Sequence, residues 1–192
     1  MAQFFYKYGA MKSGKSMDLI KTKINYDRSN RDVLVLKPSI DTRDGEKITT
    51  RLGKSIDVTL LKKESSLLTV VNNEILNNKN IRAILIDEAQ FLTRAQVWEL
   101  GVIVDDMDIS VICYGLKTNF KGYLFEGSRA LLEIVDKIEE IKTICQFCER
   151  KAILNLRMKR QEDGSLVKEE NGDEILIGDD EYIQVCREHF FE

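Results

Sequence analysis

Short apolar runs with little polar alternation recur along the chain, and segments with helical spacing of apolar side chains separate them. The runs predict buried strands at residues 3–8, 32–36, 57–61, 83–86 and 110–115. Helical spacing predicts helices at residues 16–26, 64–76, 93–102 and 128–135. Thr93 and Gln96 form a capping-box pair, and Pro38 is expected to stop a strand. Buried strands that alternate with helices are typical of an α/β fold with a parallel sheet.

The pattern changes in the last quarter of the chain, which predicts two domains, 1–143 and 144–192. The second contains a charged stretch at residues 159–174, with turn signals at two glycines. It predicts a small unit of strands and loops, too short to be held together by its apolar residues alone.

Composition excludes several classes of protein. The 192 residues are 43% hydrophobic and 32% charged, which is ordinary for a globular protein. No apolar run approaches the roughly 20 residues of a transmembrane helix, and residues 1–8 lack the pattern of a signal peptide. We therefore expect a cytoplasmic protein without a membrane partner. The net charge of -3 lowers the expectation of a nucleic-acid partner and suits a small anionic substrate.

The segment after the first predicted strand matches the phosphate-loop pattern G-x-x-x-x-G-K-S/T, and a predicted helix follows it, as this pattern requires. Its residues are Gly9, Ala10, Met11, Lys12, Ser13, Gly14, Lys15 and Ser16. Backbone N–H groups would hold the phosphates of ATP, Lys15 would reach the β and γ phosphates, and Ser16 would bind Mg²⁺. The first domain is therefore expected to be a P-loop (RecA-like) parallel sheet with helices on both faces.

Asp87 and Glu88 follow a predicted buried strand in the stretch "ILIDEAQF". An Asp at this place holds Mg²⁺ in P-loop proteins. A carboxylate beside the metal, such as Glu88, can accept a proton from the group that attacks the γ-phosphate. That group is water in a helicase-like ATPase, which carries a similar four-letter box, and a hydroxyl in a kinase. The stretch alone leaves both open.

Four residues near the C-terminus have the spacing of metal ligands. Cys145 and Cys148 form C-x-x-C, and Cys186 and His189 form C-x-x-H. Such a pair predicts a closed tetrahedral site for structural zinc, which would stabilise a domain of this size. The fourth cysteine, Cys113, lies in a predicted strand and is expected to be part of the core.

These parts, in this order, with Asp41-Thr42-Arg43 and the stretch "YGLKTNF", resemble the thymidine kinase family of the bacterial and animal cytosolic type, which has a zinc-bearing C-terminal lasso. The resemblance covers essentially the whole chain. It implies an ATP:thymidine 5′-phosphotransferase that forms dTMP in nucleotide salvage. It also implies a homotetramer and inhibition by the end-product triphosphate.

The resemblance assigns the chemistry to particular residues. Glu88 would be the base that takes the 5′-hydroxyl proton of the nucleoside, Asp87 and Ser16 would serve Mg²⁺, and Gln90 would help place the nucleotide. The expected contacts to ATP come from Gly9, Ala10, Met11, Lys12, Ser13, Gly14, Lys15 and Ser16, and from Asp87, Glu88, Ala89 and Gln90.

A nucleoside pocket is implied as well. Met11, Leu116 and Phe120 would enclose the thymine base, Tyr182 would pack over the base or sugar, and the backbone near Asn155 would bond the base edge. The whole expected set is Met11, Asp41, Arg43, Phe91, Leu116, Phe120, Asn155, Ile175, Gly178 and Tyr182. Outside the resemblance, the apolar members of this set would be ordinary core residues.

Two positions depart from the family pattern. Ile177 stands where many members have the first of two glycines, and the fourth zinc ligand, His189, is a cysteine in animal members. Asp41 and Arg43 match the pattern and are expected near the transferring phosphate and the metal.

Two other classes of function compete with the kinase. A helicase-like motor usually closes ATP between two P-loop domains, and this chain has one phosphate loop. An oligomeric ATPase acting on nucleic acid would need an arginine finger from a neighbouring subunit. A non-catalytic zinc-ribbon adaptor would not need Glu88 at all.

Overall fold

The computed structural model describes residues 1–41, 45, 47–49, 53–161, 165–169 and 182–192. Up to residue 140 the elements are β1 (Phe4–Tyr8), α1 (Lys15–Arg28), β2 (Asp32–Pro38), β3 (Lys47–Thr49), β4 (Ser55–Asp57), β5 (Thr59–Leu61), α2 (Leu67–Asn77), β6 (Ile81–Ile86), the 3₁₀ helix η1 (Ala89–Phe91), α3 (Arg94–Met107), β7 (Ser110–Gly115), α4 (Glu126–Ile134) and β8 (Lys137–Glu140). They are followed by β9 (Leu154–Arg160), β10 (Leu166–Lys168), β11 (Tyr182–Val185) and α5 (Arg187–Phe191).

A six-stranded sheet in the order β5-β2-β6-β7-β1-β8 forms the centre of the fold. Every neighbouring pair in it is parallel, which confirms the predicted parallel sheet. Strand β8, of sequence KIEE, was not predicted, because an exposed edge strand needs no apolar run. The strand predicted at 57–61 is confirmed only for β5 (Thr59–Leu61), because Asp57 is the last residue of a separate strand, β4.

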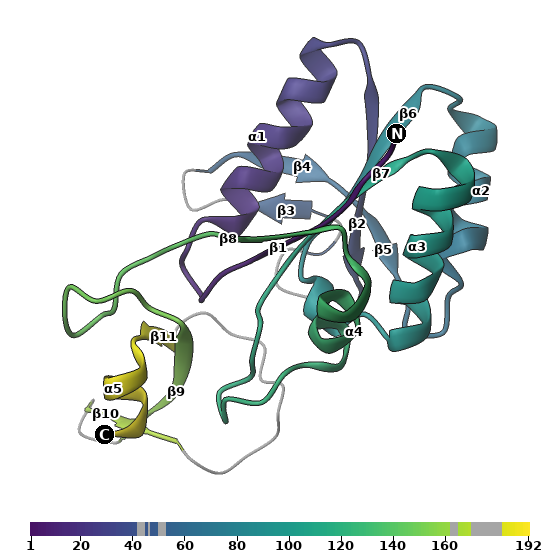
Figure 1. Ribbon diagram of the computed structural model, residues 1–192. Coiled ribbons are helices and arrows are strands. Elements are labelled where there is room, and N and C mark those ends of the chain that lie inside the picture. Colours follow the sequence, from purple (N-terminus) through teal and green to yellow (C-terminus); the bar gives the residue numbers. More distant parts are fainter. Residues whose placement is uncertain (42–44, 46, 50–52, 162–164, 170–181) are drawn as a thin grey trace.

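Helices cover both faces of this sheet, as predicted (Figure 1). On one face, Leu19 and Ile20 of α1 pack with Val35, Leu85 and Ile112 of the sheet. The β3–β4 hairpin joins this layer through its buried Ile48. On the other face, α2, α3 and α4 bury their apolar sides in a larger core. Because helices cover both faces of the sheet, the ends of its strands are left as the place where side chains from several elements can meet.

Local capping explains where two helices begin. The predicted capping box at Thr93 and Gln96 is confirmed, with the Gln96 amide N–H donating to Thr93 Oγ1 at 3.2 Å. Helix α2 begins at Leu67, later than predicted, because Ser66 is its N-cap and accepts from the amide of Thr69. Glu99 of α3 accepts hydrogen bonds from the first amides of α2, which joins the two helices.

Residues 144–192, which we call the C-terminal region, contain a second, antiparallel sheet in the order β10-β9-β11. Its apolar face packs with α5 and the cysteines in a separate small core. Helix α5 was not predicted, since only strands and loops were expected here. In Figure 1 this region lies beside the end of β1 that leads into α1.

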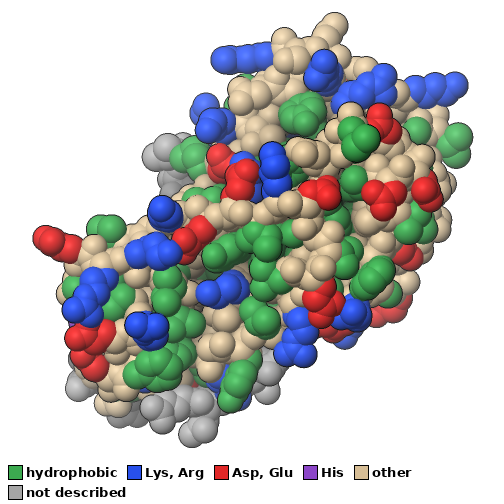
Figure 2. Space-filling view, viewed as in Figure 1, with side chains coloured by type: hydrophobic (Ala, Val, Ile, Leu, Met, Phe, Trp, Pro, Cys, Tyr) green, Lys and Arg blue, Asp and Glu red, His purple; other side chains and the backbone are tan. Residues whose placement is uncertain are grey.

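The surface mixes charges of both signs. On the face shown in Figure 2, basic and acidic side chains are interspersed, with apolar side chains between them. A protein that tracks a nucleic-acid backbone usually concentrates its basic residues on one face. Within the part of the chain that the structure describes, none of the helices is long and apolar enough to cross a bilayer.

Two helical glycines give a matched test of the packing. A Cβ on Gly127 of α4 would lie 2.6 Å from the carbonyl oxygen of Ala89, whereas a Cβ on Gly101 of α3 would meet only Ile134 Cδ1, at 3.6 Å. We expect Gly127→Ala to destabilise the protein by about 1–3 kcal/mol, because rigid backbone must shift. Gly101→Ala should stabilise it by about 0.5–1 kcal/mol. Urea unfolding measures both, and equal effects would contradict the close approach of α4 and η1.

Candidate active site and metal centre

Three strands end at one edge of the parallel sheet, and the expected nucleotide-site residues follow those ends. Strands β1 and β6 both pair with β7. The phosphate loop follows β1, Asp87 follows β6 and Leu116 follows β7. Open parallel sheets bind ligands outside the carboxyl ends of their strands. The fold therefore brings the separated motifs to one place.

The phosphate loop curls around the amine of its own lysine. The buried Lys15 Nζ donates hydrogen bonds to the carbonyls of Gly9 (3.3 Å) and Ala10 (2.9 Å). Gly14, the N-cap of α1, has a φ of 90°, a left-handed conformation that other residues adopt only with strain. The first N–H groups of α1 have no acceptor within the helix, so the loop and the helix offer donors to an anion.

One hydroxyl of this loop is buried and lacks a partner. Ser13 Oγ is closed off from solvent, and no described residue forms a hydrogen bond with it. Burying a hydroxyl in this state costs about 1–3 kcal/mol. A phosphate oxygen seated in the loop would accept its hydrogen. This group therefore fits the expected nucleotide.

The two expected magnesium ligands are in contact. Ser16 Oγ donates a hydrogen bond to Asp87 Oδ2 at 3.2 Å, and Asp87 Oδ1 accepts from the amide of Glu88 at 3.0 Å. Asp87 is placed by its own amide, which bonds to the carbonyl of Leu36 in the neighbouring strand β2. A hydroxyl and a carboxylate are the oxygen ligands that Mg²⁺ prefers, so this donor set fits the ion.

The electrostatics of Asp87 favour a cation. Burial, and next the nearby Glu88 carboxylate, raise the pKa of Asp87 to about 7, although Lys15 and Ser16 act in the opposite direction. Without a further positive charge, the protein's own groups do not fully compensate this carboxylate. A divalent cation at the pair would supply the missing charge.

Glu88 is held in place by a neighbouring amide. Its backbone has a φ of 51°, an uncommon conformation for a residue with a side chain, and such strain clusters at functional sites. Gln90 Nε2 donates to Glu88 Oε2 at 2.6 Å, while Gln90 Oε1 accepts from the amide of Leu116 at 3.0 Å. A Cβ on Gly115 would lie 2.7 Å from that Oε1 and 3.1 Å from the backbone nitrogen of Gln90, so a larger residue there would displace the Gln90 side chain. The buried Gln90 thus links the acidic pair to the end of β7.

The end of β7 is itself fixed. The Leu116 carbonyl accepts hydrogen bonds from the hydroxyls of Ser128 (2.6 Å) and Tyr6 (2.7 Å). Sequence reasoning did not single out Tyr6 or Ser128. Their hydroxyls lie in otherwise apolar segments, and only the fold shows that both reach the same carbonyl.

The expected nucleoside residues divide into groups. Met11 lies in the phosphate loop, and its amide donates to Asn155 Oδ1 at 2.7 Å. Phe120 is buried beneath the guanidinium of Arg157, 5.2 Å from its ring centroid. Tyr182 is buried, and it is the register partner of Arg157. The structure therefore brings residues of the C-terminal region against the phosphate loop and the loop after β7.

Other members of the expected set are placed differently. The ring of Phe91 packs edge-on against Phe125, with centroids 5.7 Å apart. Asp41 forms a buried ion pair with Lys37 of β2 at 3.1 Å, a partner that sequence reasoning missed. Arg43, Ile175 and Gly178, together with the departure at Ile177, lie outside the described residues.

The four expected metal ligands converge in the C-terminal region. The ligand atoms of Cys145, Cys148, Cys186 and His189 all lie within 4.8 Å of one another. His189 Nδ1 is 3.6 Å from Cys148 Sγ and 3.2 Å from Cys186 Sγ, and these two sulfurs are 3.8 Å apart. Tetrahedral zinc, with bonds of about 2.3 Å to sulfur and 2.0 Å to nitrogen, implies edges of about 3.8 and 3.5 Å. The cluster is compatible with zinc.

Hydrogen bonds to the sulfurs of Cys145 and Cys186 favour their thiolate form. The amide of Phe147 donates to Cys145 Sγ at 3.4 Å. A hydrogen bond from the His189 backbone, and next the His189 ring, lower the pKa of Cys186 to about 7. The thiolate is the form that binds metal, so this environment favours a ligand role over that of an inert core thiol.

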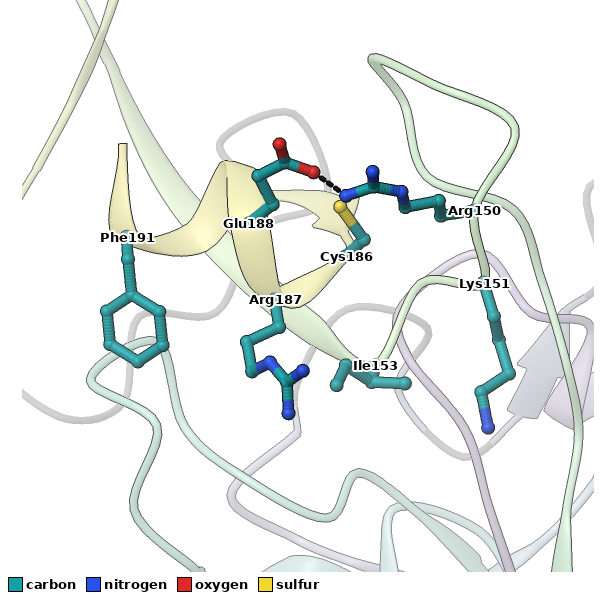
Figure 3. Close-up of a pocket in the computed structure, with 7 residues that line it drawn as sticks. All are labelled: Arg150, Lys151, Ile153, Cys186, Arg187, Glu188 and Phe191. Atoms are coloured by element: carbon teal, nitrogen blue, oxygen red, sulfur yellow. Dashed lines mark ion pairs between the residues drawn. The ribbon is translucent and has the colours of Figure 1, made fainter.

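An open hollow lies next to the metal centre, and Figure 3 shows the side chains around it. Arg150 and Glu188 form an ion pair across part of it. No residue of the phosphate loop lines it, so it is separate from the nucleotide site. Its lining residues are Arg150, Lys151, Ile153, Cys186, Arg187, Glu188 and Phe191.

The chain has the arrangement of a P-loop nucleotide-binding protein. A strand, a phosphate loop and a helix follow one another, and a buried carboxylate contacts the serine of the loop. Comparison with known proteins narrows this class. The family model for thymidine kinase matches residues 2–190. The chain belongs to the thymidine kinase family, and its enzyme class is that of nucleoside kinases.

Individual relatives align with this chain over nearly their full length. The thymidine kinase of Streptococcus gordonii is 43% identical over 194 residues, which cover 100% of this chain and 97% of that protein. Thymidine kinases of Lactiplantibacillus plantarum and Coxiella burnetii are 43% and 42% identical, and the alignments cover 96% and 95% of those proteins. Among solved structures, the Pif1 helicase from Candida albicans aligns with a TM-score of 0.42, 16% identity and coverage of 74% of this chain and 36% of the helicase, a likeness too remote to bear on function.

Asp87→Asn tests the electrostatics of the site. Because the fold raises the pKa of Asp87 from 3.8 to about 7, the folded protein keeps a proton that the unfolded chain releases. Stability therefore falls as pH rises between these two values, and the full penalty applies above them. In magnesium-free buffer, the melting temperature of Asp87→Asn minus that of the unsubstituted protein should therefore increase by roughly several degrees between pH 5 and pH 8. Thermal unfolding measures this, without chelators that would remove a bound zinc, and a difference independent of pH would contradict it.

Proposed function

We propose that this chain transfers the γ-phosphoryl group of ATP to the 5′-hydroxyl of thymidine, releasing ADP and thymidine 5′-monophosphate. The observation that carries the proposal is the position of Glu88. Its carboxylate is held by Gln90 at 2.6 Å, directly after Asp87, which contacts Ser16 of the phosphate loop. Membership of the thymidine kinase family supports the choice of substrate.

In the proposed reaction, the 5′-oxygen of thymidine bonds to the γ-phosphorus as the bond between that phosphorus and the β–γ bridging oxygen breaks. The hydroxyl proton passes to the Glu88 carboxylate, and ADP leaves. The amine of Lys15, which rests on the carbonyls of Gly9 and Ala10, is close enough to the loop to meet the phosphates. Gln90 keeps Glu88 turned toward the end of β7 rather than free in solvent.

Magnesium is proposed to accompany ATP, where it would neutralise phosphate charge. Ser16 and Asp87 would hold it, and their contact at 3.2 Å supports this. Asp41 and Arg43 are proposed to lie near the same phosphates. Lys37 would keep the Asp41 carboxylate in a fixed orientation through their buried ion pair.

The thymidine pocket is proposed to lie between the phosphate loop, the loop after β7 and the C-terminal region. Buried Phe120 and Tyr182 support this position, since Arg157 connects the two segments that carry them. An apolar wall distinguishes the thymine methyl by only about 1–3 kcal/mol. The proposed pocket residues are Met11, Phe91, Leu116, Phe120, Asn155, Ile175, Gly178 and Tyr182.

The wider organisation is proposed from the family resemblance. Residues 1–143 would form the kinase domain and 144–192 the zinc-binding lasso domain, which the separate core around the cysteines supports. We also propose a homotetramer that works in the cytoplasm without a nucleic-acid partner. A single phosphate loop and interspersed surface charges support a nucleoside substrate over a nucleic acid.

Structural zinc is proposed to occupy the cluster of Cys145, Cys148, Cys186 and His189. We expect about one zinc per purified chain, as a closed four-ligand site implies, and loss of most of it in Cys186→Ser. Cys113→Ala is the matched control, because this buried cysteine lies in β7 outside the cluster. Metal analysis measures zinc, and limited proteolysis measures the order of residues 144–192. Unchanged protease sensitivity after metal removal would contradict a structural metal.

Glu88→Gln tests the function. We expect turnover to fall by about 10²–10⁴-fold, because the variant lacks a base, while ATP binding stays near normal. Glu133→Gln is the control, since that carboxylate lies on α4 in an exposed ion pair with Arg94. ADP release is measured with a panel of nucleosides, with single-stranded DNA and with no acceptor. Stimulation by DNA but not by thymidine would overturn the kinase proposal in favour of an ATPase.

A further inference from the structure

The β9–β11 pair has two chemically different faces. Leu156 and Met158 of β9 and Val185 of β11 belong to the small core around the cysteines. Side chains alternate along a strand, so the residues between them point the opposite way. That opposite face, which we call the inner face, is polar and yet buried: Asn155, Arg157, Tyr182 and Gln184.

Two residues of the inner face contact the nucleotide-binding part of the molecule. Asn155 Oδ1 accepts a hydrogen bond from the amide of Met11 at 2.7 Å, and the Arg157 guanidinium lies over the ring of Phe120. Asn155 is 4% exposed. Register pairs these residues with Gln184 and Tyr182 of β11. A strand of the C-terminal region thus touches both the phosphate loop and the loop after β7.

The Met11 amide lies at a sensitive point of the phosphate loop. The next residue, Lys12, has a φ of 61°, which costs about 1–2 kcal/mol for a residue with a side chain. On either side, the loop is tied by the Gly9 amide to the carbonyl of Gly115, and by the Ser13 amide to the carbonyl of Ala10. The bond to Asn155 holds the segment between these ties, from outside the loop.

The position of Asn155 depends in turn on the metal centre. The amide of Gln146, between two of the cysteine ligands, donates to the carbonyl of Gln184, and the amide of Ile153 donates to the carbonyl of Val185. Cys186 directly follows β11. A continuous chain of backbone contacts therefore runs from the cysteine cluster through β11 and β9 to the phosphate loop.

We infer that Asn155 is a positioning residue for the phosphate loop, and that its bond to Met11 makes ATP affinity depend on docking of the metal-held sheet. The inference rests on the proposed nucleotide site. The C-terminal region is then more than a cover for the nucleoside, because it also fixes the backbone that holds the phosphates. The sequence predicted that the backbone near Asn155 contacts the thymine base. In the structure, the side chain of Asn155 contacts the phosphate loop.

The test compares Asn155→Leu, which removes the acceptor at similar size, with Asn155→Asp, which keeps an acceptor oxygen in the same place. Gln184→Leu is the matched control, because Gln184 lies opposite on the same face and its Oε1 bonds to no described residue. Asn155→Ala provides a second loss of the acceptor if the leucine variant folds poorly. Zinc content and circular dichroism check that each variant is intact.

Two measurements test the two parts of the proposal separately, the hydrogen bond to Met11 and its effect on nucleotide affinity. The first is hydrogen exchange of the Met11 amide by NMR without any nucleotide. It should accelerate about 10-fold in Asn155→Leu and Asn155→Ala but not in Asn155→Asp or Gln184→Leu, as loss of one hydrogen bond implies. The second is MgADP affinity by calorimetry, which should fall about 3–10-fold in Asn155→Leu with zinc content unchanged.

Protection of the Met11 amide in both Asn155→Leu and Asn155→Ala would overturn the positioning role. Equal MgADP affinity in Asn155→Leu and the unsubstituted protein would overturn the link to ATP. If the unsubstituted protein does not bind MgADP at all, the proposed function fails together with that link. In that case, faster exchange of the Met11 amide in Asn155→Leu and Asn155→Ala would still show that the Asn155–Met11 hydrogen bond exists, although the proposed function had failed.

Discussion

Burial of the Asp87 carboxylate is the constraint around which the nucleotide site is organised. A carboxylate removed from water needs compensating charge and hydrogen bonds. The hydroxyl of Ser16 and the amide of Glu88 supply bonds, and Lys15 supplies a nearby charge. Lys15 and Ser16 follow β1, whereas Asp87 and Glu88 follow β6. The register of these two strands with β7, which lies between them, therefore has to bring their ends together. Even so, burial and Glu88 prevail over the compensation, which leaves a deficit that a divalent cation would meet.

A single amide side chain connects this acidic pair to the rest of the site. Gln90 has a donor and an acceptor on one rigid plane, and it uses the donor for Glu88 and the acceptor for Leu116. The Leu116 carbonyl is fixed again by two hydroxyls from β1 and α4. The orientation of the carboxylate and the end of β7 therefore cannot vary independently.

Much of the fold and of the candidate site could be predicted from short patterns. The phosphate loop, the Thr93–Gln96 capping box and the paired cysteine motifs have fixed spacings because local geometry requires them. Strand β8 could not be predicted in this way, since an edge strand with charged residues lacks an apolar run. Contacts such as Gln90 with Leu116 or Asn155 with Met11 were also out of reach, because they depend on tertiary packing. One signal was available in retrospect: Asn155 and Arg157 alternate with apolar residues in β9, which indicates a second, polar face.

The position of β1 in the sheet has a consequence for how the molecule is made. This first strand lies between β7 and β8, so Phe4 pairs with Val111 and Phe5 with Lys137. Contacts between residues so far apart along the chain have a loop-closure cost that must be met before they stabilise the fold, and such contacts slow folding. During synthesis β1 leaves the ribosome before β7 and β8, and it cannot pair with them until they have followed. The phosphate loop directly follows β1, so its final position depends on strands that are made about a hundred residues later.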